Sequence, residues 1–221
     1  MKIDKKIFRE FTDYTTAHDW GLKNYAEWIS RLSRESPQQS EITSNLVSSY
    51  INAEHDWGIA DVLFGYTGSK NMIYNQILND ETNFDEGEIL QFSKEIELID
   101  SELRKFALPE NIVVSRYTHK FAVDQLFKNQ KVKVGETLQY KGFVSTTLVE
   151  DKLREFAKNH KYNCVLRIYL RKGIMGAYIW FEDGLNEAEF LLPKNCTLKL
   201  LKKRFFYKGL FWLYECVLVS Q

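Results

Sequence analysis

Two glutamates separated by one residue have the clearest catalytic potential in this sequence. The stretch NEAEFLLP carries Glu187 and Glu189, and in a β-strand alternate residues point to the same face. We therefore expect the two carboxylates to share one site. Paired carboxylates repel, so one pKa rises while the other group stays ionised, which divides acid–base work from stabilisation of a cation. A solvated acidic edge strand is the alternative, and the apolar residues that follow argue against it.

Two further polar features interrupt apolar strands in the second half. Arg116 lies within VVSRY, where a buried charge is costly unless it pairs with an anion, and a guanidinium suits bidentate contact with phosphate. Ser145, Thr146 and Thr147 end the apolar run GFVSTTL, where hydroxyls bind polar ligand groups, hold a carboxylate or pair across a sheet. Taken alone, a structural ion pair explains Arg116 equally well, and cross-strand pairing is the simpler explanation of the hydroxyls.

The tetrapeptide HDWG occurs twice, at 18–21 and 55–58. Histidine and aspartate are ordinary ligands of zinc and iron. Adjacent helical residues point about 100° apart, however, and cannot chelate one ion as residues i and i+4 do. We therefore interpret Trp20 and Trp57 as packing residues and expect no metal site. The three cysteines are too widely spaced for a disulfide framework or a CxxC metal site, which favours a reducing compartment.

The secondary structure that must position these residues is predicted to change from helices to strands at Pro109. Before it, four segments have apolar residues at helical spacing, namely 24–32, 44–66, 71–80 and 87–108. Gly65 and Gly68 predict a turn between the second and third. The residues expected on the buried stripes are Tyr25, Trp28, Ile29 and Leu32, then Leu46, Tyr50, Ile51 and Ala53, then Ile89, Phe92, Ile96, Ile99 and Leu103.

After Pro109 the sequence is typical of short strands separated by glycines. The predicted strands lie in NIVVSRY, TLQYKGFVSTT, NCVLRIYL, AYIWF, EAEFLL, TLKLLKKRFFY and LFWLYECVLVS, with short helices near 119–129 and 150–159. The fold class is therefore α+β. We expect a helical lobe over residues 1–110 and a mostly antiparallel, two-sheet core over 111–221. No Gly/Ser/Pro linker separates them, which predicts a single domain over 1–221.

Composition narrows the class of protein. The 221 residues are 44% hydrophobic and 27% charged, typical of a globular domain rather than a disordered chain. Apolar runs are far shorter than the roughly 20 residues of a spanning helix, and the first residues lack the hydrophobic run of a signal peptide. Residues 1–110 carry 11 Lys and Arg against 20 Asp and Glu, net −9, and residues 111–221 carry 19 against 10, net +9. The basic half is the better seat for a phosphate-bearing ligand.

As an ordered set, these residues resemble a known enzyme family. Arg116, the strand of Ser145 and the pair Glu187 and Glu189 are similar to the arginine–serine–glutamate class of mono-ADP-ribosyltransferases, as in clostridial Rho-modifying exoenzymes and the enzymatic components of binary actin-modifying toxins. The stretches KGFVSTTL, RKGIMGAYI and EAEFLLPKNCTLKL parallel that family, and YTGSKNMIYNQIL resembles its helix over the dinucleotide. The resemblance covers about residues 60–205.

The resemblance implies an ADP-ribosyltransferase core that takes NAD⁺ as co-substrate and needs no metal. Arg116 would hold the phosphate nearest the nicotinamide ribose, while Ser145 would order the site around nicotinamide and orient Glu189. Tyr74 and Asn75 would line the dinucleotide cleft. The residues implied to contact NAD⁺ are Arg116, Tyr74, Asn75, Tyr117, Ser145, Thr146, Thr147 and Glu189.

The resemblance also implies the catalytic roles and the acceptor. Glu189 would bind the ribose 2′-hydroxyl and stabilise the oxocarbenium-like centre as nicotinamide leaves, as carboxylates do in glycosidases. Glu187 would position and deprotonate the nucleophile. A glutamate at this first position accompanies arginine modification in the family, since a guanidinium needs a carboxylate to orient it and draw off its proton. The implied catalytic set is Glu189, Glu187, Arg116 and Ser145.

Several positions depart from the family pattern, and Thr147 at the third serine or threonine position is a minor change. Tyr117 follows the strand arginine where the family often has a glycine whose backbone approaches nicotinamide. Gly184, Leu185 and Asn186 precede the glutamate pair where the family often has an aromatic residue, and the nearest aromatics, Trp180 and Phe181, lie further upstream. Because that turn selects the acceptor, these departures bear on the macromolecule that is modified.

Two other functions stay open. KLLKKRFFYKGLFW interleaves basic and aromatic residues as single-strand-binding surfaces do, so an ADP-ribosyltransferase that modifies nucleic acid inside the producing cell is the alternative to one that modifies protein arginine. The second open function is that of a catalytically inactive relative that binds a partner through the fold alone. We expect a cytoplasmic protein, or one delivered into the cytosol of a target cell, with a possible antitoxin or delivery partner.

Overall fold

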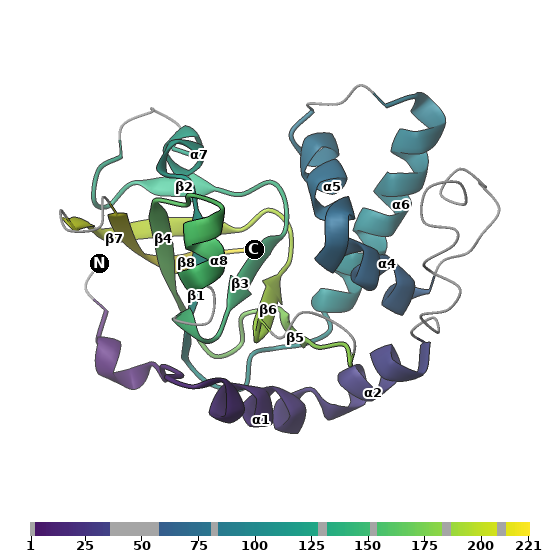
Figure 1. Cartoon of the computed structure of the whole chain (residues 1–221), viewed down its shortest axis with the longest axis horizontal. Coiled ribbons are helices and arrows are strands. Elements are labelled where there is room, and N and C mark those ends of the chain that lie inside the picture. The colour runs from purple at the N-terminus through teal and green to yellow at the C-terminus, as the bar shows by residue number, and fades with distance from the viewer. Residues whose placement is uncertain are drawn as a thin grey trace.

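The computed structural model of the chain describes residues 3–35, 58–80, 84–127, 132–150, 154–182, 187–206 and 211–221 (Figure 1). Helices dominate the first half and strands the second, so the predicted α+β class is confirmed. The helices are η1 (Lys5–Ile7), α1 (Tyr14–Asn24), α2 (Ala26–Glu35), α4 (Ile59–Gly65), η3 (Tyr66–Lys70), α5 (Asn71–Leu78), α6 (Glu86–Leu103), α7 (Lys120–Gln125) and α8 (Arg154–Asn159). The short helices α7 and α8 fall where the sequence predicts them.

The first predicted helical stripe is confirmed. Trp28, Ile29 and Leu32 of α2, and Tyr25 just before it, are each at most 5% exposed. The Asp13 side chain accepts a hydrogen bond from the Thr16 N–H and so caps the start of α1. The second predicted stripe, Leu46 to Ala53, lies outside the described residues, as does Trp57.

The predicted turn between Gly65 and Gly68 is a kinked helical segment. After α4 the chain continues into the π-helical turn η3, and Gly68 (φ −86°, ψ −114°) breaks it before α5 begins at Asn71. The Asn71 side chain donates to the backbone carbonyls of Tyr66 and Gly68, which fixes the kink. Irregular turns of this kind within helices are frequent at functional sites.

Helix α6 begins with a capping box and ends earlier than the sequence predicts. The Asp85 side chain accepts from the Glu88 N–H, and the Glu88 side chain accepts from the Asp85 N–H. Phe92, Ile96, Ile99 and Leu103 are buried as expected. The helix stops at Leu103 rather than near Pro109, because residues 106–108 pair instead with residues 173–176, through hydrogen bonds such as Leu108 N–H to the Ile174 carbonyl at 2.7 Å.

The strands form a single hydrogen-bonded sheet in the order β2-β7-β8-β4-β1-β3-β6-β5. Every pairing is antiparallel except that of β4 with β8. The strands are β1 (Ile112–Thr118), β2 (Thr137–Gln139), β3 (Val144–Thr147), β4 (Cys164–Leu170), β5 (Ala177–Ile179), β6 (Glu189–Leu192), β7 (Thr197–Phe206) and β8 (Phe211–Ser220).

The sequence predicts two sheets, whereas the structure has one sheet whose two parts meet at a narrow junction. β1 pairs with β4 over seven residues, whereas it pairs with β3 only through Ser115 opposite Thr147. The sheet therefore consists of a large part from β2 to β1 and a small part from β3 to β5, joined at one residue pair. This junction lies beside the predicted site residues.

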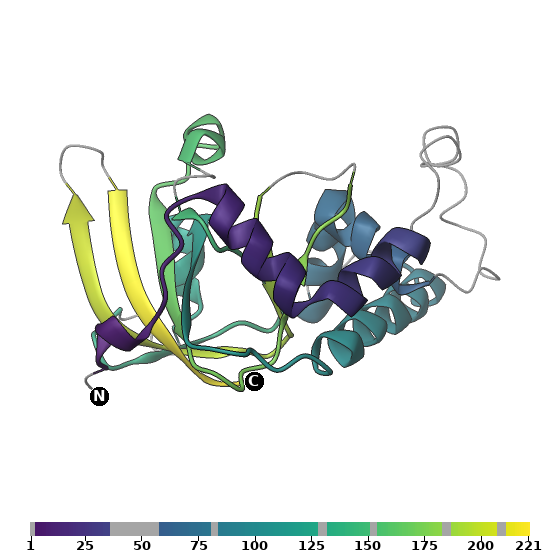
Figure 2. The ribbon, with the colours of Figure 1, turned by 90° about the horizontal axis from the view of Figure 1, so that it is seen from below.

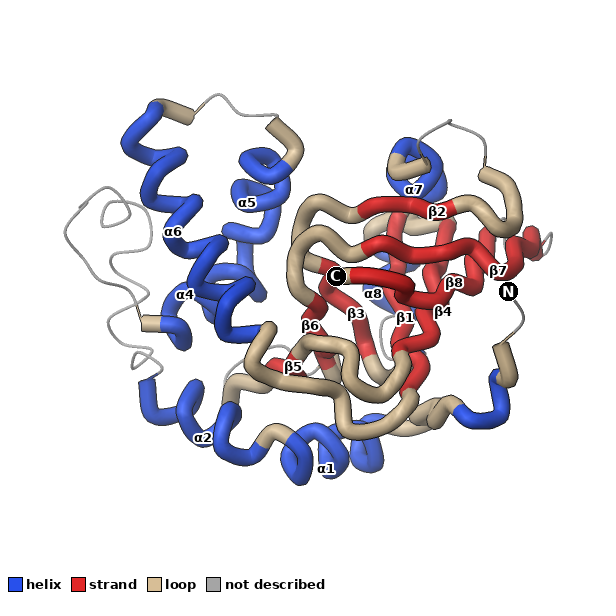
Figure 3. The backbone as a smooth tube through the Cα atoms, turned by 180° about the vertical axis from the view of Figure 1, so that it is seen from behind, coloured by secondary structure: helices blue, strands red, loops and turns tan. Residues whose placement is uncertain are grey.

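The two halves share one hydrophobic core. Figure 3 shows α4, α5 and α6 grouped beside the strands, while α1 and α2 run along both groups (Figures 2 and 3). Buried side chains of both halves belong to a single cluster, in which the rings of Tyr25 and Phe190 lie 6.1 Å apart. At Gly21 a Cβ would lie 2.3 Å from the Tyr178 ring, so α1 packs against β5 at a distance that only glycine permits.

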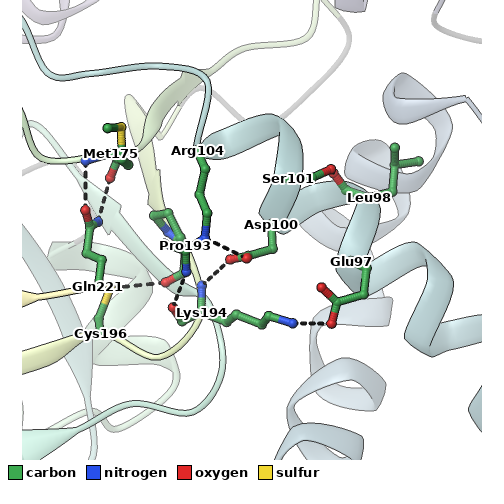
Figure 4. Close-up of polar contacts among 10 residues, drawn as sticks. All are labelled: Glu97, Leu98, Asp100, Ser101, Arg104, Met175, Pro193, Lys194, Cys196 and Gln221. Atoms are coloured by element: carbon green, nitrogen blue, oxygen red, sulfur yellow. Dashed lines mark hydrogen bonds and ion pairs between the residues drawn. The ribbon is translucent and has the colours of Figure 1, made fainter.

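A polar joint formed by Asp100, Arg104 and Lys194 links the end of α6 to the loop after β6 (Figure 4). The buried Asp100 carboxylate accepts from Arg104 Nε at 2.7 Å and from the Lys194 backbone N–H at 3.1 Å. Arg104 also donates to the Lys194 carbonyl, and the Lys194 ammonium pairs with Glu97. The Gln221 side chain closes the same region through two hydrogen bonds with the Met175 backbone.

The substitution Asp100→Ala tests this joint. It leaves the Lys194 N–H without its acceptor and Arg104 without its carboxylate, so we expect the free energy of unfolding to fall by about 2–3 kcal/mol. The control is Glu35→Ala, which removes an exposed i,i+4 partner of Arg31 and should change stability by less than about 0.5 kcal/mol. Urea denaturation measures both, and equal losses would contradict a special role for the joint.

Candidate functional site

The centre of the site is the carboxylate of Glu189 and the hydroxyl of Ser145. Strands β3 and β6 are antiparallel, with Thr147 opposite Glu189 and Ser145 opposite Leu191. Ser145 and Glu189 are therefore diagonal neighbours, within reach across the sheet. The Ser145 hydroxyl donates to Glu189 Oε1 at 2.6 Å, and this bond fixes the orientation of the carboxylate.

Glu187 reaches the same cavity by a route that differs from the sequence prediction. β6 begins at Glu189, and Ala188 has φ +49°, so strand alternation does not put the two glutamates on one face. Instead, the Thr147 hydroxyl donates to the Glu187 carbonyl at 2.6 Å, and the Leu148 N–H donates to the Ala188 carbonyl at 2.9 Å. These bonds hold the left-handed residue that brings the Glu187 side chain to the cavity.

Arg116 provides the cationic wall. Its Nη1 donates to the Ser145 carbonyl at 2.8 Å, and its Nε is buried without a hydrogen-bond partner among the described residues. No ion pair joins it to another described side chain, so the structural ion pair considered from the sequence is not found there. A buried guanidinium N–H without an acceptor favours an anionic ligand at this position.

These groups line a cavity of about 400 Å³ between the sheet junction and the helical lobe. That volume lies in the range of small-molecule sites. Its wall is formed by Tyr66, Thr67, Gly68, Asn71, Asn75, Ser115, Arg116, Tyr117, Ser145, Thr146, Tyr162, Glu187 and Glu189. Side chains from η3, α5, β1, β3 and the start of β6 therefore meet at the cavity.

Most residues predicted to contact a dinucleotide lie in this wall. Asn75, Tyr117 and Thr146 line the cavity with Arg116 and Ser145. Thr147 is completely buried behind it, where its hydroxyl supports the Glu187 backbone. A Cβ at Gly142 would lie 2.2 Å from Asn75 Oδ1, so the glycine before β3 allows α5 to approach the sheet.

The prediction for Tyr74 is wrong. Its side chain is fully buried and does not line the cavity, and its hydroxyl donates to Glu95 of α6. Tyr74 and Asn75 are adjacent on a helix, so their side chains point about 100° apart and only one of them faces the cavity. The ring of Tyr74 stacks on that of Tyr66, which does line the cavity.

Six wall residues were absent from the sequence prediction, namely Tyr66, Thr67, Gly68, Asn71, Ser115 and Tyr162. Tyr66, Thr67 and Asn71 belong to the kinked segment around Gly68, and the stretch YTGSKN, interrupted by glycine, was the available signal. Tyr162 follows α8, and nothing in its local sequence indicates that it approaches the cavity. Its ring contacts that of His119 at 4.9 Å, a contact created only by the pairing of β1 with β4.

A buried ion pair of Lys70 with Glu95 lies behind the helical wall, the side of the cavity that η3 and α5 form. Lys70 Nζ lies 2.9 Å from Glu95 Oε2, and the two side chains are only 8% and 5% exposed. Tyr74 donates to the same oxygen of Glu95. Because Lys70 ends the kinked segment that carries Tyr66 and Thr67, the pair ties this segment to α6. Charges buried together constrain geometry strongly, since separating them leaves an unpaired charge in the interior.

Burial sets the electrostatics of the two glutamates. The pKa of Glu189 is raised to about 7, mainly by removal from water and also by the charge of Glu187, while the Ser145 hydrogen bond and Arg116 oppose the increase. Burial also raises the pKa of Glu187. Near neutral pH, Glu189 therefore exists in both protonation states, and a cationic ligand beside it would favour the ionised state.

The HDWG motif has a structural explanation where it is described. His18 Nδ1 lies 3.0 Å from the Tyr178 hydroxyl, and Trp20 is buried in the core, as predicted. Within the described residues, no three or more His, Cys, Asp or Glu side chains lie together as metal ligands would. No described helix is both long and apolar enough to cross a membrane.

Comparison with known proteins identifies the class. The family described as ADP-ribosyltransferase exoenzyme matches residues 17–206. This chain belongs to that family of ADP-ribosyltransferases. The Nε of Arg116, which has no hydrogen-bond partner among the described residues, and the polar side chains of the cavity wall fit an anionic dinucleotide. A search of curated proteins finds none that matches the chain.

Solved structures share the fold. The ADP-ribosylating toxin BECa of a binary enterotoxin of C. perfringens, with NADH, is 23% identical with a TM-score of 0.72 and covers 96% of this chain, which spans only 50% of that one. The C3 exoenzyme of Clostridium limosum is 21% identical (TM-score 0.65, covering 96% and 98%). C3stau2 from S. aureus, with NAD, is 16% identical (TM-score 0.65, covering 97% and 99%).

The substitution Glu95→Gln tests whether the buried ion pair positions the helical wall. It leaves Lys70 buried without its counter-charge, so we expect the KM for NAD⁺ to rise about fivefold or more while kcat changes less. The matched control is Glu102→Gln on the same helix, which removes an equally buried carboxylate bound by Arg31 and Lys105. Steady-state kinetics with thermal melts compares them. A similar rise in KM for both variants would show a general loss of stability instead.

The substitution Glu189→Gln tests the electrostatics. Because burial raises the pKa of Glu189 from 4.5 to about 7, folding favours the protonated carboxyl, and its contribution to stability is lost as pH rises between these values. Glu189→Gln should therefore stabilise the fold by about 1–3 kcal/mol at about pH 8 and much less at about pH 5. Urea denaturation at both pH values measures this, with the exposed Glu136→Gln as control. A pH-independent difference would contradict it.

Proposed function

We propose that this enzyme transfers ADP-ribose from NAD⁺ to an arginine side chain of a protein and releases nicotinamide. The observation that carries the proposal is the convergence of Ser145-bound Glu189, Glu187 and Arg116 on one cavity. Two neighbouring carboxylates with raised pKa values and a guanidinium without an anion match the charges that develop in this reaction.

Arg116 binds the dinucleotide in this proposal. Its free Nε donates to the phosphate nearest the nicotinamide ribose, while its Nη1 remains on the Ser145 carbonyl. Charge-assisted hydrogen bonds from guanidinium to phosphate are strong and directional. Asn75, Thr146 and Tyr117 line the same cavity and border the dinucleotide. The structures with NADH and with NAD among the similar proteins support a nucleotide in this fold.

Glu189 stabilises the cation formed when the bond to nicotinamide breaks. The electron pair of that bond leaves with the nicotinamide nitrogen, and positive charge develops on the ribose carbon and ring oxygen. An ionised Glu189 accepts a hydrogen bond from the 2′-hydroxyl and stabilises this charge in a medium of low dielectric. Ser145 keeps the carboxylate in place by donating to its other side. A pKa of about 7 means that activity increases as pH rises through neutrality.

Glu187 acts on the acceptor. It lines the cavity beside Glu189 but follows the segment 183–186, which lies outside the described residues. A guanidinium is a poor nucleophile while protonated, so attack requires a carboxylate that orients it and accepts its proton. Burial raises the pKa of Glu187, which makes it a stronger base toward that proton. An antitoxin or a delivery partner stays a prediction.

The variants Glu189→Gln and Glu187→Gln separate the two roles. Loss of the Glu189 charge should lower nicotinamide release by about 100-fold or more, because the ribosyl cation loses its stabilising anion. Loss of the Glu187 carboxylate should lower transfer to agmatine, a small guanidine, by about 100-fold while hydrolysis of NAD⁺ falls less than about tenfold. Radiolabelled NAD⁺ measures both reactions, and Glu136→Gln serves as control. Wild type that releases nicotinamide without labelling agmatine would refute arginine as the acceptor.

A further inference from the structure

The ends of β7 and β8 present an aromatic and basic surface to solvent. The two strands pair as far as Phe206 opposite Phe211. Phe206 is 48% exposed, a high value for a large apolar side chain. Lys202, Arg204 and Phe206 alternate along β7 and therefore point to one face, which they share with Phe211. We call these four residues the hairpin surface.

On the opposite face of the same strands, the side chains pack against one another. The Phe205 ring lies 4.9 Å from that of Trp212, and the ammonium groups of Lys203 and Lys120 lie over Trp212 at 5.9 and 5.1 Å. On the hairpin surface, by contrast, neither Lys202 nor Arg204 forms an ion pair with any described residue. The nearest acid in register, Glu215, is bound by Lys5.

Among the described residues, the outer edge of β7 is unpaired beyond the turn of residues 132–136, which bonds to Leu200 and accepts a hydrogen bond from the Lys203 ammonium at the Val132 carbonyl. β2 pairs with β7 only from Thr197 to Lys199, and no described strand pairs with the outer edge from Leu201 to Phe206. An unpaired strand edge offers backbone donors and acceptors to another extended polypeptide. Alternate cations on the adjacent face lie about 7 Å apart, the spacing of alternate side chains in such a polypeptide.

The hairpin surface is continuous with the active-site cavity. The Phe211 ring lies 5.9 Å from that of Tyr117, and Tyr117 lines the cavity next to Arg116. A macromolecule that places one side chain against Glu187 can therefore also contact Phe206 and Arg204.

We propose that the hairpin surface and the open edge of β7 dock an acidic, extended segment of the protein acceptor. The segment adds to β7 through its backbone, its acidic side chains at alternate positions pair with Lys202 and Arg204, and an apolar side chain packs on Phe206. Docking here raises the local concentration of the modified side chain at the cavity. The inference rests on the proposed protein acceptor, but it concerns a surface outside the catalytic residues.

Binding of defined peptides tests the surface without relying on catalysis. Two fluorescent peptides of equal length are compared by anisotropy, one with glutamate at alternate positions between threonine and valine, the other with serine in place of glutamate. Wild type should bind the glutamate peptide about tenfold more tightly, and the preference should shrink with added salt. Lys202→Ser/Arg204→Ser should abolish the preference. The matched control is Arg171→Ser/Lys172→Ser, an exposed basic pair on the turn after β4, which should retain it.

A catalytic readout separates this proposal from the proposed function. The hairpin variant should hydrolyse NAD⁺ and modify agmatine within about twofold of wild type, while its kcat/KM for an arginine placed in the glutamate peptide falls about tenfold. Equal peptide affinities in wild type, or an unchanged preference in the variant, would overturn the docking surface. Tighter binding of a fluorescent oligonucleotide than of the glutamate peptide would assign the surface to nucleic acid instead and also overturn it. Failure of wild type to modify agmatine would refute the arginine acceptor alone, because peptide binding is measured independently.

Discussion

The burial of Glu189 beside Arg116 is the constraint on which the rest of the site depends. A carboxylate removed from water is unstable as an anion, and this cost raises its pKa to about 7. Ser145 and Arg116 offset part of that cost through a hydrogen bond and a nearby charge. In the proposed reaction, the environment that disfavours the free anion strengthens its interaction with a cation formed in the cavity, because little water screens the charges.

The helical lobe is needed because the sheet supplies only one wall of the cavity. η3 and the start of α5 supply the other, and their geometry depends on the kink at Gly68 and on the buried pair of Lys70 with Glu95. α6 carries Glu95 on one side and Asp100 on another, so a single helix connects the cavity wall to the loop after β6. A shift of α6 would therefore displace both the helical wall and the loop after β6.

The sheet connects the proposed catalytic residues with the proposed docking surface. β1 carries Arg116 and Tyr117 at its end, pairs with β4, and through β4 reaches β8 and β7. The narrow junction at Ser115 and Thr147 lets the small part of the sheet, with Ser145 and Glu189, turn relative to the large part. Ser115 and Arg116 on one side of this junction and Ser145 and Glu189 on the other line the cavity, while the large part of the sheet continues through β4 and β8 to the hairpin surface.

Local sequence indicated the residues that we propose carry the chemistry, and predicted much of the secondary structure around them. Hydrophobic periodicity predicted the stripes of α2 and α6, and residue type and order indicated Arg116, Ser145 and the glutamate pair, because these signals lie in short windows of chain. Tertiary structure decided the rest. Glu187 reaches the cavity through a left-handed Ala188 held by Thr147, Tyr74 turns away from it toward Glu95, and Tyr162 arrives from a distant loop. Each outcome depends on hydrogen bonds or packing between residues far apart in the chain, which periodicity and spacing do not encode.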